Sequence, residues 1–188
     1  AALGFGTETI PRVRKIVGPG SPPVACAQVE MQRYGVATMM ILGPTESVVI
    51  ADDSADARWA AADLLNEAEH GTDSAVLLIT PSAVLADAID VELQRQLATL
   101  PAARAEAARA ALGSNGGCVL VGDLDEAADV ANRWAPEHLQ VAVAPAAEAE
   151  LLARLVNAGE ILIGQQTLFS AGNFVIGCPA SLPTGGFA

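Results

Sequence analysis

The sequence predicts an α/β protein in which helices cover both faces of a parallel β-sheet. About five short apolar segments alternate with longer helical segments, and parallel strands need such crossovers between them. The segment Ser47–Ala51 is apolar at nearly every position, which is typical of a strand buried on both faces. Hydrophobic residues make up 52% of the chain and aromatic residues only 4%, so we expect an aliphatic core.

The first part of the chain, to Pro23, is dense in glycine and proline, which predicts turns and close backbone approach rather than regular structure. A helix is expected from Pro22 to about Arg33, because proline in the first helical turn costs no hydrogen bond. Asp53 and Asp56 are among the N-cap candidates for the next helix, and prolines open two later ones. The other expected elements are an apolar run at 39–42, strands at 47–51, 75–80, 118–122, 139–143 and 161–164, and helices at 57–69, 81–98, 101–112, 124–134 and 146–157.

Composition excludes several classes of function. The net charge of −12 argues against nucleic-acid binding, which needs a basic face. No apolar run approaches the roughly 18 residues of a membrane span, and no signal peptide is visible. Cys26, Cys118 and Cys178 lack metal-site spacing and are expected to be reduced, mostly buried thiols of a cytoplasmic protein. The sequence begins without methionine, and we interpret it as part of a larger polypeptide.

The two histidines of the chain carry its strongest chemical signal, because each follows a glutamate directly. Glu67 and His70 lie three residues apart at the end of a predicted helix, so they share a face and can bind one cation, whereas Glu69 points elsewhere. Glu137-His138 precedes a predicted strand and has the composition of a general base beside a carboxylate. A solvated surface pair is the alternative for either.

A glycine-rich turn, Gly18-Pro19-Gly20-Ser21, precedes the first predicted long helix. A helix N-terminus behind such a turn can bind a phosphate. The sequence contains neither the dinucleotide-binding fingerprint nor a phosphate loop, so a structural turn is the favoured interpretation.

Several motifs in fixed order resemble histidinol dehydrogenase from end to end of the chain. They are Gly6-Thr7-Glu8-Thr9-Ile10-Pro11, Lys15-Ile16-Val17-Gly18-Pro19-Gly20, Gly43-Pro44-Thr45-Glu46, Val49-Ile50-Ala51-Asp52, Asp63-Leu64-Leu65 with Ala68-Glu69-His70, Arg95-Gln96-Leu97, Ala135-Pro136-Glu137-His138-Leu139, Ser170-Ala171-Gly172 and Leu182-Pro183-Thr184-Gly185-Gly186.

The resemblance implies a zinc-dependent homodimer that uses two NAD molecules in succession to oxidise the amino alcohol L-histidinol through an aldehyde to L-histidine. It implies that His138 takes the alcohol proton and that Glu137 activates the water attacking the aldehyde. Zinc would act as a template and Lewis acid for the substrate.

Further site residues follow from the same resemblance. His70 matches a zinc ligand, and Glu67 and Asn173 stand where the family has a glutamine and an aspartate ligand. Thr45 keeps the hydroxyl of a substrate-contacting serine. The expected substrate-binding set is Thr45, Glu67, His70, His138 and Asn173. Ser21 replaces an asparagine near the cofactor.

Other departures remove polar groups from the expected pocket. Phe169 replaces a glutamate that the family has near the substrate ammonium. Phe174 replaces a tyrosine, Met39 replaces an aspartate, and the segment Cys178–Ser181 lacks an expected Asn-His pair. These losses favour an alternative, an NAD-dependent dehydrogenase of another small polar alcohol. A third hypothesis is a non-catalytic homologue.

The family fold pairs two Rossmann-like domains, which are incomplete versions of a dinucleotide-binding domain. By resemblance, residues 1–42 are the end of one such domain. Residues 43–188 are the second half of the other, without its C-terminal part, and a further histidine ligand would lie beyond Ala188.

Overall fold

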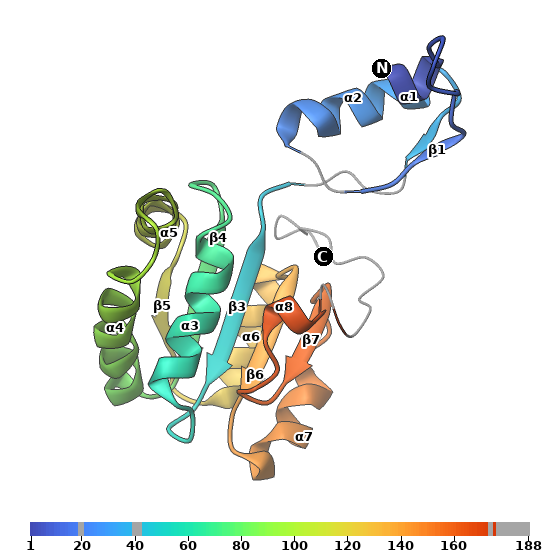
Figure 1. Ribbon diagram of the computed structural model, residues 1–188. Coiled ribbons are helices and arrows are strands. Elements are labelled where there is room, and N and C mark those ends of the chain that lie inside the picture. The colour runs from blue at the N-terminus through green and yellow to red at the C-terminus, as the bar shows by residue number, and fades with distance from the viewer. Residues whose placement is uncertain (19–20, 39–42, 173–174, 176–188) are drawn as a thin grey trace. The chain divides into compact units, whose positions relative to one another are not determined.

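The computed structural model describes residues 1–18, 21–38, 43–172 and 175 (Figure 1). The chain divides into two compact units. Unit 1 is Ala1–Gly43, and unit 2 is Pro44–Ala188.

Unit 1 contains two helices and two short strands, α1 (Ala2–Phe5), β1 (Lys15–Ile16), α2 (Pro22–Gln32) and β2 (Ala37–Thr38). The strands pair in parallel, and α2 begins at Pro22 as predicted. The prediction of turns before residue 23 is wrong for α1 and β1. Gly4 lies inside α1, where a Cβ would meet the side chain of Met31, so this glycine permits close packing rather than a turn.

Unit 2 is built on a five-stranded parallel sheet with the order β5-β4-β3-β6-β7. The strands are β3 (Glu46–Ala51), β4 (Ala75–Thr80), β5 (Gly117–Leu120), β6 (His138–Ala142) and β7 (Glu160–Ile163). The predicted parallel sheet is confirmed, and each strand lies within a few residues of its expected position.

Helices cover both faces of this sheet (Figure 1). One face packs against α3 (Ala57–Ala68), α4 (Ala83–Leu97), α5 (Ala102–Ser114) and the short α8 (Phe169–Ala171). The other packs against α6 (Leu124–Trp134) and α7 (Pro145–Arg154). Alternation along each strand divides the core, because Val49 faces α3 whereas Val48 faces the α6 and α7 side.

Side-chain caps set the starts of three helices. Asp56 Oδ1 accepts from the Arg58 amide at 2.9 Å, and Ser82 Oγ accepts from the Leu85 amide at 3.1 Å. Asp123 caps α6 in the same way. These bonds satisfy amides that a helix leaves unpaired at its first turn. The cap at Asp56 fixes where α3 begins and thus places Glu67 in its last turn.

The strand register aligns the starts of three neighbouring strands. Ser47 of β3 is the partner of His138 of β6, and His138 is the partner of Glu160 of β7. Partners in register project from the same face of a sheet. These three side chains therefore lie on the face that α3 and α8 cover.

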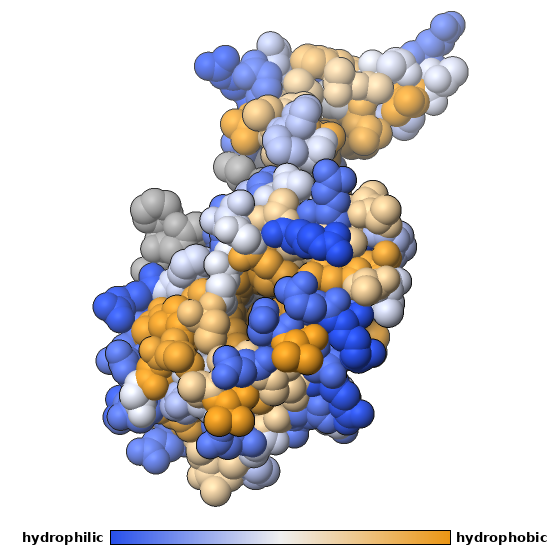
Figure 2. Space-filling model, turned by 90° about the vertical axis from the view of Figure 1, so that its left-hand side faces the viewer, coloured by the Kyte–Doolittle hydropathy of each residue, from blue (hydrophilic) through white to orange (hydrophobic). Residues whose placement is uncertain are grey.

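The cysteines differ from expectation. Cys26 and Cys118 are exposed, so the prediction of mostly buried thiols is wrong for them, and Cys178 lies outside the described residues. Cys118 is exposed because β5 is an edge strand. Figure 2 views the side formed by α4, α5 and β5, where hydrophobic and hydrophilic areas alternate. Among the described residues, no helix combines the length and hydropathy of a membrane span.

We expect Ile79→Ala to destabilise unit 2 by about 2–5 kcal/mol, because Ile79 is fully buried and truncation leaves a cavity. Urea denaturation measures this free energy of unfolding. The control Val84→Ala removes an apolar side chain that is 79% exposed and should change stability by less than about 0.5 kcal/mol. Equal effects of the two substitutions would contradict the described core.

Candidate active site

The candidate site lies at the amino-terminal edge of the sheet. Thr45 precedes β3, Glu137-His138 begins β6 and Glu160 begins β7, while α3 contributes Glu67 from its last turn. Ligands of open α/β sheets usually bind at the opposite, carboxyl edge. Glu137-His138 comes directly before a predicted strand, which is compatible with this edge, but the sequence did not predict the placement of the site.

A single hydroxyl joins two buried carboxylates. Thr45 Oγ1 lies 2.9 Å from Glu67 Oε2 and 3.2 Å from Glu137 Oε2. Glu67 is 1% exposed and Glu137 is 8% exposed. A hydroxyl has one proton to donate, so Thr45 satisfies only one of these oxygens at a time. The structure therefore brings together three residues that the sequence assigned to the site.

The pair of carboxylates is electrostatically costly. Burial raises the pKa of Glu137 above its ordinary value, and the charge of Glu67 raises it further, while His138 and the Thr45 hydroxyl oppose the rise. Each carboxylate lies near a histidine: His70 Nδ1 is 3.9 Å from Glu67 Oε2, and His138 Nε2 is 3.5 Å from Glu137 Oε1. A divalent cation would relieve this excess of negative charge.

Glu67 and His70 are close enough to act together, as their spacing predicted. Glu67 Oε1 accepts from Asn66 Nδ2 at 2.6 Å, which orients the carboxylate. His70 Nδ1 lies 2.9 Å from the Asn66 carbonyl oxygen, so Nδ1 carries the ring proton and Nε2 presents the lone pair. That is the tautomer in which a histidine binds a metal through Nε2.

His138 is held from two sides. Its Nδ1 lies 2.5 Å from Glu160 Oε1 and its Nε2 lies 3.5 Å from Glu137 Oε1. The ring of Phe169 packs against it with centroids 5.8 Å apart. Sequence reasoning missed Glu160, because the contact depends on the register between β6 and β7. The one available signal is an acidic residue at the start of an otherwise apolar strand.

A second missed residue is Asp63, one helical turn before Glu67 on α3. It is 2% exposed, and its Oδ2 is a buried atom without a hydrogen-bond partner among the described residues. Burial raises its pKa to about 6; a hydrogen bond from Gln140 lowers it, and the charge of Glu67 raises it. The interior beside the site therefore holds a carboxyl group that resists ionisation.

The remaining predicted residues lie apart from this cluster or outside the described residues. Asn173 is among the latter, as are Met39, Phe174 and the segment Cys178–Ser181. Within the described part of the chain, no group of three or more His, Cys, Asp or Glu residues is arranged to hold a metal ion.

Ser21 belongs to unit 1, where it is the N-cap of α2 and makes no side-chain capping bond. Pro22 and Pro23 follow it at the first helical positions and have no amide hydrogens, so this helix start offers few donors to a phosphate. That agrees with the preference for a structural turn.

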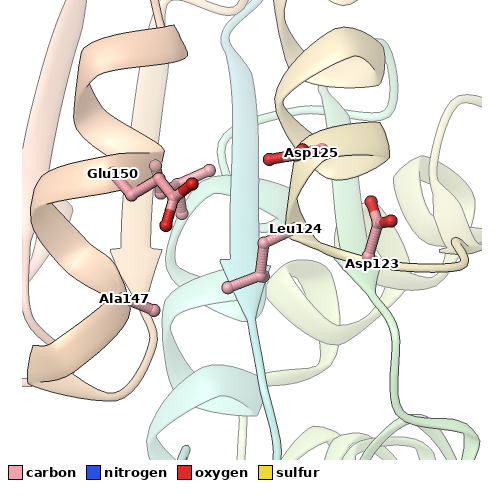
Figure 3. Close-up of a pocket in the computed structure, with 6 residues that line it drawn as sticks. Asp123, Leu124, Asp125, Ala147 and Glu150 are labelled. Atoms are coloured by element: carbon pink, nitrogen blue, oxygen red, sulfur yellow. The ribbon is translucent and has the colours of Figure 1, made fainter.

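A cavity of about 300 Å³ lies elsewhere, between the starts of α6 and α7 (Figure 3). Its lining consists of Asp123, Leu124, Asp125, Ala147, Glu150 and Leu151. Asp123 caps α6 and Asp125 pairs with Arg154, so two of its acidic groups have structural partners. None of the predicted site residues lines it.

Comparison with known proteins decides the family. The family model for histidinol dehydrogenase matches residues 1–188. The chain belongs to the histidinol dehydrogenase family. It is 45% identical over 188 residues to the histidinol dehydrogenase of Synechocystis sp., covering all of this chain and 43% of that protein. It is 47% identical over 186 residues to that of Rhizobium meliloti, covering 98% and 41%.

Solved structures agree. The histidinol dehydrogenase of Elizabethkingia anophelis superposes with a TM-score of 0.89 at 36% identity, over 99% of this chain and 42% of that one. An acetylating aldehyde dehydrogenase from Geobacillus thermoglucosidasius has a TM-score of 0.55 at 17% identity, over 89% and 50%, which shows a shared fold alone. The chain thus spans less than half the length of the histidinol dehydrogenases that it matches here.

We expect Asp63→Asn to remove a pH-dependent loss of stability. Burial raises the pKa of Asp63 to about 6 in the folded state, against about 3.9 for an ordinary aspartate. The stability that its protonated form contributes is therefore complete below about pH 4 and is lost as pH rises through 6. The loss is roughly 3 kcal/mol at about 1.4 kcal/mol per pKa unit.

Urea denaturation of wild type and variant at pH 4.5 and 7.5 captures about 2 kcal/mol of this loss, because the rest falls below pH 4.5. Asp87→Asn makes the same change at an exposed position of α4 and should keep the wild-type dependence. If Asp63→Asn leaves the pH dependence unaltered, the buried carboxyl described here is wrong.

Proposed function

We propose that the protein to which this chain belongs is an NAD-dependent oxidoreductase of histidine biosynthesis, which oxidises L-histidinol through the aldehyde to L-histidine. The observation that carries the proposal is the Thr45 hydroxyl. It joins Glu137 of the catalytic pair to Glu67 of the proposed metal site. One site thus contains a base, a water-activating carboxylate and metal-ligating groups.

His138 is the proposed base for the alcohol proton. Its side chain is 3% exposed, so water competes little for the ring, and Phe169 and Glu160 limit the rotation of the ring. Glu137 is the proposed base for water. Because burial raises its pKa, its carboxylate takes a proton more readily than an ordinary glutamate does.

Zinc is the proposed metal, and the described donors suit it. Glu67 and His70 supply a buried carboxylate oxygen and an imidazole nitrogen, ligand types that zinc accepts. Asn173 is proposed as a third ligand. Bound zinc would hold the substrate amine and imidazole, acting as a template and Lewis acid.

NAD is the proposed oxidant, with Ser21 contacting it through its hydroxyl group. We propose further that the protein is a cytoplasmic homodimer. In this proposal unit 1 ends one Rossmann-like domain and unit 2 forms the second half of another.

A second candidate is oxidation of another small polar alcohol. The ring of Phe169 is fully buried against His138, where the family resemblance leads one to expect a carboxylate for the substrate ammonium. An apolar ring there favours a substrate that is less positively charged beside the reacting carbon.

The complete protein, loaded with zinc and NAD, tests the proposal. We expect two NADH per L-histidinol, and a loss of about 10²-fold or more in kcat for His138→Ala, because the base is removed. Asp87→Asn, on the exposed side of α4, is the control and should keep full activity. NADH formation from another alcohol but not from L-histidinol would support the second candidate instead, and no turnover of either would contradict both.

A further inference from the structure

We infer that Glu160 is a positioning residue for His138, fixing the tautomer in which Nε2 accepts the alcohol proton. The inference rests on the proposed function, because that function assigns His138 as the base. Nothing in the family comparison assigns Glu160, and it acts through His138 rather than on the substrate.

The contact between the two residues is set by the sheet. Glu160 and His138 are partners in the parallel β6–β7 register, so their side chains leave the same face. Glu160 Oε1 lies 2.5 Å from His138 Nδ1, and both side chains are nearly buried, at 11% and 3% exposure. The Glu160 amide also donates to the Glu137 carbonyl oxygen at 2.9 Å. One strand residue therefore holds the backbone of Glu137 and the ring of His138.

The structure makes room for the Glu160 carboxylate. A Cβ on Gly172 would lie 2.6 Å from Glu160 Oε2 and 2.7 Å from Oε1, so any larger residue at 172 would require the carboxylate to move. Glycine at 172 thus leaves space that the carboxylate fills. Phe169, three residues earlier, packs on the imidazole. The carboxylate and ring are confined together, which distinguishes this contact from a chance surface pair.

The chemical consequence follows from hydrogen-bond direction. A carboxylate only accepts, so the proton of neutral His138 must reside on Nδ1. Nε2, on the side of Glu137, then carries the lone pair that takes the alcohol proton. When it does so, the ring becomes an imidazolium, and the adjacent Glu160 carboxylate stabilises that charge. The opposite tautomer would carry a proton on Nε2 and could not act as the base.

Glu160→Met tests the inference, since it keeps the length of the side chain and removes the acceptor. In the complete protein we expect kcat to fall about tenfold or more with KM for the alcohol little changed, because substrate binding groups remain. Glu106→Met makes the same change at an exposed position of α5 and should leave kcat unaltered.

Nitrogen-15 NMR of the histidines at about pH 8, where imidazole is ordinarily neutral, gives a readout independent of activity. His138→Asn identifies the His138 signals. We expect the wild type to show Nδ1–H and Glu160→Met to shift toward Nε2–H. A wild type with Nε2–H, or a variant whose tautomer or kcat is unchanged, would overturn the inference. If the wild type oxidises no alcohol but its His138 carries the proton on Nδ1, the proposed function is wrong while the hydrogen bond to Glu160 is supported.

Discussion

One proton shared by two buried carboxylates is the constraint on which the candidate site depends. The Thr45 hydroxyl lies within hydrogen-bond distance of both Glu67 and Glu137 but can donate to only one. The repulsion left over contributes to the raised pKa of Glu137. It also favours a cation beside Glu67. The same short contact thus links the basicity of Glu137 to the metal binding proposed for Glu67.

The fold supplies this contact through the amino-terminal edge of its sheet. Thr45 lies in the loop before β3, and His138 is the first residue of β6. Glu67 lies in the last turn of α3, where its carboxylate contacts the Thr45 hydroxyl. Parallel strands in register give Ser47, His138 and Glu160 a common face. Burial by α3 and α8 then raises the strength of each electrostatic interaction, because water is excluded from it.

Local patterns predicted much of this structure, and contacts between distant segments account for what was missed. Apolar runs predicted the five strands, and a short polar residue before a helical segment predicted the helix cap at Asp56. The spacing of Glu67 and His70 is a property of one helix. Glu160 and Asp63 escaped notice because their importance arises from register and from the packing of α3, neither of which a sequence displays. Thr45 was assigned to the site only through the family resemblance, and its contacts with Glu67 and Glu137 were not predicted.

Diffraction from crystals of the complete protein at the zinc absorption edge tests the central claim most directly. The account predicts an anomalous peak within coordination distance, about 2.0–2.2 Å, of a Glu67 carboxylate oxygen and of His70 Nε2, with Thr45 still bridging to Glu137. A fully zinc-loaded crystal with its peak elsewhere, or with Glu67 turned away from the metal, would contradict it.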